Sequence, residues 1–295
     1  MLHRTFSEKV FNVFNYIILI VLCVVTLYPL WHVTMASFSD PITVFAKRGF
    51  YFIPAPPLNF LGYDLVIHNP NISSGFLNTL FYVVVGTVLS MFLTIIGGYV
   101  LSRKGVYWNK AIMKGIIFTM YFQGGLIPFY MLVLNLGMKN SRWAIILPIA
   151  INTFNLIIMR TAFYGVSDSM VESAKLDGAS DWRIIWTIMV PLAQATVAVI
   201  ALFYGVRMWN EWFNPAIFLN SKDKFPLQLV LREILINNDT SSMRPSGLIG
   251  QSSQESYRLL VKYCTIVVGT IPILVVYPFL QRYFVKGIMI GGVKG

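Results

Sequence analysis

Six long apolar stretches constrain this chain more than any other feature of its sequence. A helix that crosses a bilayer needs about 20 mostly apolar residues, and windows of this kind lie at roughly 12–36, 76–101, 112–134, 143–160, 190–213 and 262–282. The first window has a long apolar core and no small-residue cleavage site after it, so we expect a retained helix and not a signal peptide. The sequence predicts an all-α integral membrane protein with six transmembrane helices in a single domain over 1–295.

The composition also favours a membrane protein over a water-soluble one. Of the 295 residues, 56% are hydrophobic and 12% are charged, whereas soluble domains carry about 25% charged residues. A formal charge of +11 would suggest nucleic-acid binding in a soluble protein, but in membrane proteins basic residues flank the spans on the cytoplasmic side. We therefore expect the lipid bilayer as a partner and no nucleic acid.

The positions of Lys and Arg predict the orientation of the chain. Basic residues gather in the N-terminal tail, after the second window and after the sixth window, namely Arg4, Lys9, Arg103, Lys104, Lys110, Lys114, Arg282, Lys286 and Lys294. Both termini and the connection 161–189 are thus expected in the cytoplasm, and the connections 37–75 and 214–261 outside. Within the latter, FPLQLVLREIL looks helical, whereas 237–258 is too polar to pack by itself.

Residues that could carry catalysis or bind a metal are few and scattered. The three histidines, His3, His32 and His68, have no ligand spacing, and Cys23 and Cys264 lie in apolar segments, where we expect buried thiols that pack as small hydrophobes. The phosphate-binding pattern G-x-x-x-x-G-K-[ST] does not occur. We expect no enzymatic activity, no metal and no cofactor bound by this chain.

A short charged stretch, SDSMVESAKLDGASDW over 167–182, interrupts the apolar sequence. Ser169 and Glu172 have the spacing of a capping box, Asp177-Gly178 is typical of a helix C-terminus, and Ser180-Asp181 can cap a second helix. Pro191 should then kink or break the run before the fifth window. The pattern predicts a short helix, a tight turn and a second helix, although an ordinary charged loop could carry the same caps.

This stretch resembles the EAA loop of permeases of ABC importers. The matching positions are Glu172, Ala174, Asp177, Gly178, Ala179 and Pro191, and Ser173 replaces the commoner Ala. Further segments, among them QGGLIPFYMLVLNLGMKNSRWAIILP, MWNEWFNPAIFLN and YFVKGIMIGGVKG, resemble carbohydrate-uptake permeases of the MalG type, in particular the LplC/YtcP-like group for polysaccharides or oligosaccharides. The resemblance covers nearly the whole chain and is weakest at 237–258.

The resemblance implies a fold, a function and a set of partners. The fold would be that of a type I importer permease (MetI-like), with a coupling helix in the loop 161–189 seated in a groove of a cytoplasmic ATPase. The function would be ATP-driven import of an oligosaccharide or polysaccharide fragment across the plasma membrane of a bacterium. The implied partners are a second, related permease subunit, two copies of an ABC ATPase that bind ATP and Mg, and a lipid-anchored extracytoplasmic substrate-binding protein. A homodimer of permeases stays open.

The residues expected to couple to the ATPase follow from the same resemblance. They are Glu172, Ser173, Ala174, Asp177, Gly178, Ala179 and Pro191, together with Gly291 and Gly292 in the C-terminal tail. Glu172 would cap its helix and face the ATPase, Ala174 would allow its close approach, and Asp177-Gly178-Ala179 would set the bend. The alternative for the tail is a frayed basic end.

Polar and aromatic residues inside the windows are candidates for the substrate path, because polarity inside a span needs a reason. The candidates are Tyr121, Gln123, Asn152, Asn155, Tyr204, Arg207, Trp209, Asn210 and Glu211. Gly124, Gly125 and Pro128 should loosen the third span, and Asn152 and Asn155 should share a helical face. The group Arg207, Asn210 and Glu211 would lie about 24 Å from Pro191 along one helix. Hydrogen bonds between spans would place the same residue types there, so packing is the alternative.

Two other classes of function fit the sequence less well. An ion-coupled carrier keeps ionisable groups or broken-helix ion sites in the membrane, but Glu211 is the one acidic residue expected inside a span, and no inverted repeat is visible. A membrane-embedded enzyme would need a nucleophile–base pair or a metal cluster. Because the EAA loop contacts the ATPase and not the cargo, an importer for a non-sugar solute, such as an amino acid or peptide, remains the alternative.

Overall fold

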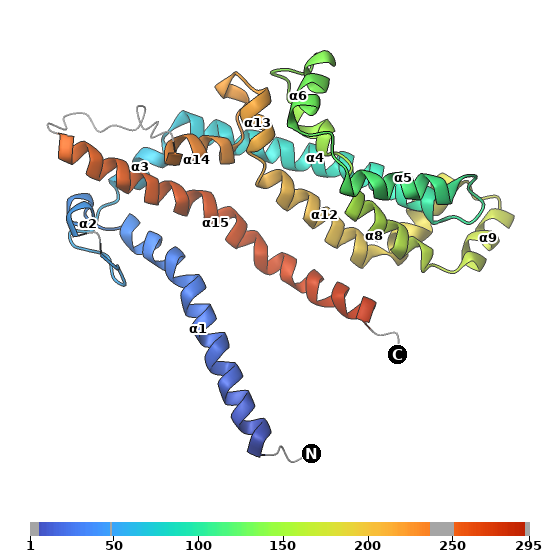
Figure 1. Cartoon of the computed structure of the whole chain (residues 1–295), viewed down its shortest axis with the longest axis horizontal. Coiled ribbons are helices and arrows are strands. Elements are labelled where there is room, and N and C mark those ends of the chain that lie inside the picture. Colours follow the sequence, from blue (N-terminus) through green and yellow to red (C-terminus); the bar gives the residue numbers. More distant parts are fainter. Residues whose placement is uncertain (1–5, 48, 237–250, 293–295) are drawn as a thin grey trace. The chain divides into compact units, whose positions relative to one another are not determined.

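The computed structural model describes residues 6–47, 49–236 and 251–292, and in the last helix it describes the side chains of 255–275 and 278. Every element in these ranges is a helix (Figure 1), which agrees with the predicted all-α class. The chain divides into two compact units, Met1–Asn69 with Glu233–Ile271 and Pro70–Arg232 with Pro272–Gly295. A single permease domain remains a prediction.

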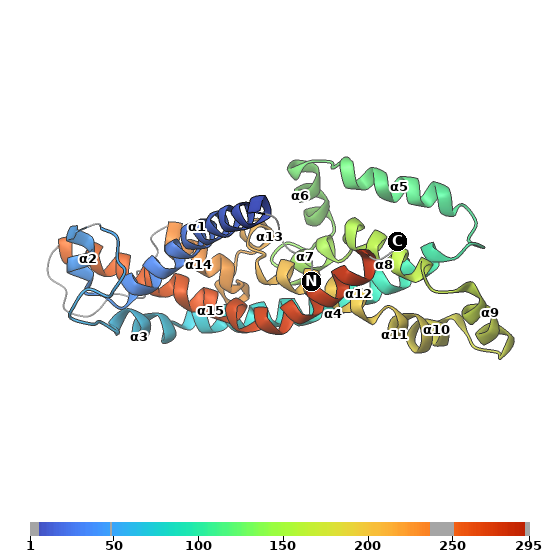
Figure 2. The ribbon, with the colours of Figure 1, turned by 90° about the horizontal axis from the view of Figure 1, so that it is seen from below.

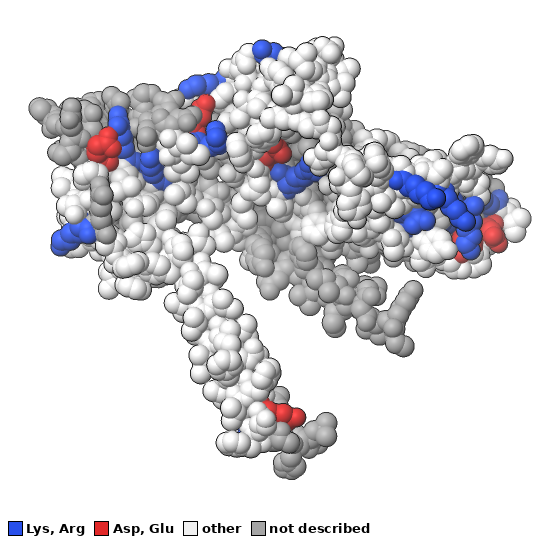
Figure 3. Space-filling view, viewed as in Figure 1, with Lys and Arg blue, Asp and Glu red and all other residues white. Residues whose placement is uncertain are grey.

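The first unit contains α1 (Phe6–Ser37), α2 (Pro41–Lys47), α3 (Leu61–Ile67) and the beginning of α15 (Gln251–Gly292). The window 12–36 thus forms one helix, as predicted. Most of the large apolar side chains of α1 are exposed, and Figure 3 shows almost no charge along it, as expected for a helix surrounded by lipid or by other spans.

The two cysteines, both expected to be buried, have different environments. Cys264 is buried on α15, where its thiol donates to the backbone carbonyl of Ser37 at 3.5 Å. Gly62 of α3 lies against it, because an added Cβ would come within 2.7 Å of its sulfur. Cys23 is exposed on α1, so its predicted burial is wrong: most of the apolar side chains around it on α1 are exposed as well.

In the second unit, α4 (Pro70–Ser102), α8 (Thr153–Tyr164) and α12 (Gln194–Trp209) run along one another (Figure 1). Two glycines of α4 permit this close approach. A Cβ on Gly86 would lie 2.5 Å from Cε of Met208, and one on Gly98 would lie 2.7 Å from Cγ of Met159. Small residues of this kind let helices in membranes pack with their backbones close together.

Replacing Gly98 by alanine is expected to destabilise the protein, because the new Cβ would also lie 3.1 Å from Cβ of Met159 and 3.3 Å from the backbone nitrogen of Arg160. Overpacking of this kind costs about 1–3 kcal/mol. The thermal unfolding midpoint of the purified chain in detergent should therefore fall by several degrees. Gly115→Ala is the matched control, because nothing lies within 4 Å of its added Cβ. Equal midpoints for the two variants would contradict the close packing.

Three of the predicted spans are interrupted. The helices α5 (Asn109–Tyr121) and α6 (Leu126–Asn135) meet at 113° (Figure 2). The helix α7 (Trp143–Ile146) with the 3-10 turn η1 (Leu147–Ile149) meets α8 at 49°. The third break, at 91°, separates Asp181–Leu192 from α12. The sequence signals for these breaks were Gly124-Gly125, with φ +85° at Gly125, and Pro191.

These breaks decide how the six predicted spans compare with the structure. Three helical stretches, α1, α4 and Glu255–Val275 of α15, are apolar and long enough to cross a membrane unbroken, and six crossings result if each bent pair is one span. The count of six therefore remains a prediction. The fifth window was expected to run as one helix from 190 to 213, but the structure turns at Ala193 and α12 ends at Trp209.

The connection after α12 is ordered, and residues 210–232 of it belong to the second unit. It contains α13 (Phe213–Phe218), η3 (Lys222–Lys224) and α14 (Leu227–Ile236), the last of which confirms the helix predicted from FPLQLVLREIL. The Nδ2 atom of Asn78 on α4 donates to the carbonyls of Asp223 and Phe225 at 2.6 and 3.2 Å. The polar stretch expected to pack poorly, 237–258, falls largely outside the described residues.

Candidate functional site

The charged stretch 167–193 folds into a bent protrusion, which we call the elbow. It consists of α9 (Asp168–Leu176), a turn, α10 (Asp181–Ile184), the π-helical turn η2 (Ile185–Met189) and α11 (Val190–Leu192). Figure 2 shows α9, α10 and α11 at one end of their unit. The predicted order of a short helix, a tight turn and a second helix is therefore present.

The predicted capping box at the start of α9 is wrong. The N-cap is Ser167, without a side-chain cap bond, and its hydroxyl instead pairs with the hydroxyl of Ser169 at 2.7 Å. Because the helix already begins at Asp168, Ser169 lies inside the first turn and is not the N-cap. Glu172 is therefore not at the third helical position, from which a capping-box side chain would bond back to the N-cap. The acidic side chain of Asp168 suits this position, since a negative charge near a helix N-terminus is favourable.

The turn after α9 has the hydrogen bonds of a Schellman motif. The backbone N–H of Ala179 donates to the carbonyl of Ala174 at 2.9 Å, and that of Gly178 donates to Lys175 at 3.0 Å. Gly178 has a φ of +81°, a conformation in which a Cβ is unfavourable. The predicted helix stop at Asp177-Gly178 is confirmed.

The second half of the elbow also follows its local signals. The hydroxyl of Ser180 accepts from the backbone N–H of Arg183 at 3.3 Å, which confirms the predicted cap. A π-helical turn then leads into Val190–Leu192, and the chain turns by 91° before α12. Pro191 lacks a backbone N–H, so the regular series of helical backbone hydrogen bonds is interrupted at this residue.

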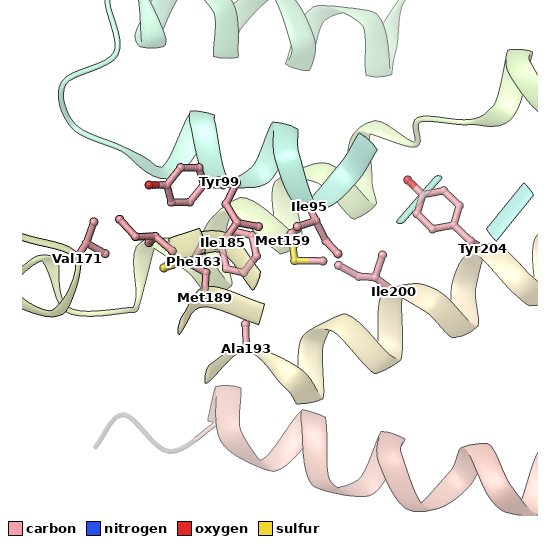
Figure 4. Close-up of a cluster of buried hydrophobic side chains, with 11 residues drawn as sticks. Ile95, Tyr99, Met159, Phe163, Val171, Ile185, Met189, Ala193, Ile200 and Tyr204 are labelled. Atoms are coloured by element: carbon pink, nitrogen blue, oxygen red, sulfur yellow. The ribbon is translucent and has the colours of Figure 1, made fainter. Parts of the chain in front are cut away.

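One face of the elbow belongs to the protein's own core. Val171, Ile184, Ile185 and Met189 are buried against side chains of α4 and α8, including Tyr99, Met159 and Phe163 (Figure 4). Ala174 and Ala179 are partly buried and pack on the same cluster. The small side chain of Ala174 lets α9 lie close to this chain's own core, and the expected approach of a partner at Ala174 stays a prediction.

Tyr99 and Asp181 join the elbow to the C-terminal end of α4. The hydroxyl of Tyr99 donates to Oδ1 of Asp181 at 2.6 Å, and the ammonium of Lys175 lies 3.1 Å from the same oxygen. Tyr99 itself is buried in the core cluster, so its hydroxyl is held in place by its ring. This contact ties both helices of the elbow to a long span.

A second anchor lies at Asp168. Its carboxylate is 2.6 Å from Nζ of Lys104 and 3.7 Å from Nη1 of Arg103, whose Nη2 donates to the carbonyl of Phe163 at 3.0 Å. The hydrogen bond from Lys104 lowers the pKa of the Asp168 carboxyl, and the same bond raises the pKa of Lys104. The pair is therefore weakened as the pH falls through the lowered pKa of Asp168, and as an exposed pair it contributes little stability.

Sequence reasoning did not identify Tyr99, Arg103, Lys104 or Lys175 as site residues. The basic residues after the second window indicated orientation only, and Tyr99 lies 82 positions from Asp181. No local spacing could have joined them.

The opposite face of the elbow is largely exposed, although the ring of Trp182 lies edge-on to those of Phe92 and Trp186, with centroids 5.9 and 5.8 Å away. Leu176 is 90% exposed at the end of α9, and Trp182 is 54% exposed. Glu172, Ser173 and Asp177 are also exposed, and among the described residues Glu172 makes no hydrogen bond or ion pair. Figure 3 shows acidic and basic side chains together at this end of the unit. The arrangement is an anchored protrusion with an apolar tip and charged surroundings, suited to fit into a groove of another protein.

Three of the candidate path residues, Tyr204, Asn152 and Asn155, are engaged in contacts within the chain. The hydroxyl of Tyr204, which is 0% exposed, pairs with Thr94 at 2.7 Å and accepts from the backbone N–H of Asn152 at 3.0 Å. Asn152 precedes α8, and its side chain caps Asn155 at 3.1 Å. The expected common helical face for Asn152 and Asn155 is wrong, because Asn152 is the N-cap and not part of the helix. A spacing of three residues also occurs between an N-cap side chain and the backbone N–H that it accepts from. Tyr204 is not available to stack on a sugar.

The group on the fifth window is also arranged differently from the expectation. Arg207 is in the last turn of α12, Asn210 is the C-cap, and Glu211 lies beyond the helix, where its carboxylate accepts from the backbone N–H of Asn214 at 3.0 Å. The expected continuous helix from Pro191 is wrong, since the chain turns at Ala193. Trp209 is partly buried, edge-to-face with Phe76 at 6.0 Å.

The remaining candidates stay predictions. Tyr121 and Gln123 are exposed beside the break between α5 and α6. Gly291 and Gly292 end α15, and their surroundings lie outside the described residues. No group of three or more His, Cys, Asp or Glu side chains that could hold a metal occurs among the residues that the structure describes.

Comparison with known proteins adds relatives that match almost the whole chain. A match to the family described as "Binding-protein-dependent transport system inner membrane component" covers residues 71–290. Protein LplC of Bacillus subtilis (strain 168) is 36% identical over 294 residues, covering 100% of this chain and 98% of LplC. The polygalacturonan/rhamnogalacturonan transport system permease protein YtcP of the same organism is 37% identical over 294 residues, with 98% and 100% covered.

A solved structure shows the same fold. A chain in the crystal structure of a bacterial ABC transporter involved in the import of the acidic polysaccharide alginate superimposes with a TM-score of 0.85 at 29% identity, covering 96% of this chain and 100% of that chain.

Proposed function

Because this chain belongs to the family of binding-protein-dependent transport system inner membrane components, we propose that it is the permease subunit of an ATP-driven importer for a saccharide. The cargo is an oligosaccharide or a polysaccharide fragment. The observation that carries this proposal is the 37% identity over 294 residues to a permease for polygalacturonan and rhamnogalacturonan. The fold shared with a chain of the alginate importer supports the same class of cargo.

The elbow supports a way in which ATP hydrolysis would drive the transport. It is exposed at Leu176 and Trp182 and anchored through Tyr99 and Asp181 to the end of α4. A groove of a cytoplasmic ATPase that receives this tip would move the elbow when the ATPase closes. Because the elbow and α4 share the buried cluster around Tyr99, the movement would pass directly into a long span.

The proposal includes the rest of the complex. A second, related permease would complete the translocation path, two ATPase copies would bind ATP and Mg on the cytoplasmic side, and an extracytoplasmic, lipid-anchored binding protein would deliver the saccharide. Both termini of this chain would be cytoplasmic, and the connections 37–75 and 214–261 would face outward. This chain would bind no nucleotide and no metal and would carry no catalytic residue.

Cross-linking of the elbow tests the coupling directly. In a Cys23→Ser background, Leu176→Cys is expected to form a disulfide under oxidation with a cysteine placed in the groove of the co-expressed ATPase, because Leu176 is 90% exposed. Thr161→Cys, exposed on α8 outside the elbow, is the control. Cross-linking from Thr161 but not from Leu176 would remove the coupling assignment.

Transport in proteoliposomes tests the cargo. The assembled complex with its binding protein should import a labelled oligogalacturonide when ATP is present inside the liposomes, and not when a non-hydrolysable analogue replaces ATP. Import of an amino acid or a peptide, without import of any saccharide, would favour the alternative importer class. Import driven by an ion gradient without ATP would overturn the proposal.

A further inference from the structure

A cavity of about 380 Å³ lies within the first unit, between the end of α1, the segment after α2 and the first turns of α15. Its size is at the small end of the range of about 300–1,000 Å³ that is typical of ligand pockets, so it would take a small group or the end of a longer chain. The positive-inside prediction places this end of α1 and α15 outside the cell. None of the elbow residues and none of the path candidates lines this cavity.

One face of α15 forms a wall of the cavity. Glu255, Arg258, Leu259, Lys262 and Tyr263 line it, and their spacing places them on a single helical face. The remaining lining residues come from α1, from α2 and from the segment that follows α2, so that with α15 four parts of the chain line the space.

Aromatic rings form the second wall. His32 lies with its ring centroid 5.8 Å from that of Tyr51 and 6.2 Å from that of Tyr263. The backbone N–H of Tyr51 donates to Nδ1 of His32 at 3.3 Å, so the neutral imidazole carries its proton on Nε2, which can donate to a ligand. Such rings provide flat apolar faces with polar edges, which suits a sugar ring.

The charges in the cavity are unbalanced. Arg258 and Glu255 pair with each other at 2.5 Å, and one acid therefore neutralises one of the two cations. Lys262 is partly exposed as a residue, and its ammonium has no hydrogen-bond or ion-pair partner among the described residues. A partly buried cation without a partner favours an anionic ligand, because a carboxylate would supply the missing charge-assisted hydrogen bond.

We propose that this cavity is an outer subsite for one uronic-acid residue of the imported saccharide. The carboxylate of that residue pairs with Lys262, its ring lies against the rings of Tyr51, His32 and Tyr263, and Glu255 accepts from a sugar hydroxyl with the oxygen that Arg258 leaves free. The assignment rests on the proposed import of a saccharide and adds to it that the cargo is acidic. The acidic substrate named for the alginate importer is consistent with this class of ligand.

Calorimetric titration of the assembled complex in nanodiscs, without ATP and without binding protein, tests the subsite. Digalacturonate should bind at least about tenfold more tightly than galactobiose, its neutral counterpart. Lys262→Met should remove this difference without changing the affinity for galactobiose, and Lys262→Arg should keep most of it. Lys47→Met, which removes an exposed ammonium at the end of α2 that does not line the cavity, should leave both affinities unchanged.

The outcomes separate the subsite from the proposed function. Equal affinities for the two disaccharides, or a digalacturonate affinity unchanged in Lys262→Met when its thermal midpoint is that of the wild type, would overturn the subsite even if ATP-driven uptake is normal. The expected binding pattern in a complex that imports no saccharide would keep the subsite and overturn the function. If Lys262→Met instead weakens docking of the binding protein and leaves digalacturonate binding intact, the carboxylate belongs to that partner and the saccharide subsite is refuted.

Discussion

Gly178→Val is expected to reduce both the substrate-stimulated ATPase activity of the assembled complex and its saccharide uptake by about tenfold. Gly178 has a φ of +81°, and a residue with a Cβ loses about 1–2 kcal/mol in the left-handed region, with β-branched residues the least tolerated there. That loss is a factor of about 5–30 in the equilibrium between the formed and the deformed turn. The bend between α9 and α10 would open, and Leu176 would no longer reach the groove of the ATPase.

The matched control for this prediction is Gly178→Asn, because asparagine tolerates the left-handed conformation better than other residues with a side chain. No atom lies within 4 Å of a Cβ at this position, so neither variant introduces a clash. Membrane insertion should be preserved in both variants, and the thermal midpoint should be preserved in Gly178→Asn. Uptake and ATPase activity should remain near wild type in Gly178→Asn. Equal defects in the two variants would show that backbone conformation at Gly178 is not what the coupling requires.

Asp181→Ala is expected to uncouple the transporter. The substitution removes the acceptor of the Tyr99 hydroxyl at 2.6 Å and of the Lys175 ammonium at 3.1 Å. A hydrogen bond to a charged group contributes about 1.5–3 kcal/mol, so the elbow should lose much of its attachment to α4. We expect the number of saccharides imported per ATP hydrolysed to fall by about tenfold while ATP hydrolysis continues. A folding defect would instead lower the rate of saccharide import and the rate of ATP hydrolysis together.

Two further variants assign this effect to one contact. Tyr99→Phe removes only the hydroxyl and keeps the ring in the buried cluster, so it should uncouple as Asp181→Ala does, and the double variant should be no worse than either single one. Lys175→Met removes an exposed ion pair of small expected energy and should have little effect. Normal stoichiometry in Tyr99→Phe would refute the link between the elbow and α4 as the route of coupling.

The features predicted correctly from the sequence depend on signals that act over a few residues. Gly178 stops α9, Ser180 caps α10, and Pro191 precedes the turn into α12, because each acts through its own backbone geometry or through an N–H three positions away. The apolar windows predicted α1 and α4 for the same reason, since a continuous run of apolar residues needs no knowledge of its neighbours.

The errors arose where two local interpretations compete or where distant residues meet. Ser167 and Ser169 are equally good caps by type, and the structure uses Ser167. The spacing of Asn152 and Asn155 fits both a shared face and a cap, and it is a cap. The pairs Tyr99–Asp181 and Lys104–Asp168 form only because α4 and the elbow are brought together by packing. Such contacts between distant segments cannot be obtained from spacing within one segment.

The glycine–methionine contacts along α4 have a consequence for how the spans can move. Gly86 faces Met208 of α12, and Gly98 faces Met159 of α8, so at both crossings a bare backbone meets an unbranched thioether. Methionine rearranges among rotamers more easily than branched side chains and fills irregular gaps. The neighbours of α4 can thus change their tilt by re-orienting flexible side chains instead of branched ones. The reversible tilting of spans that the proposed import requires would therefore meet little steric resistance at these two contacts.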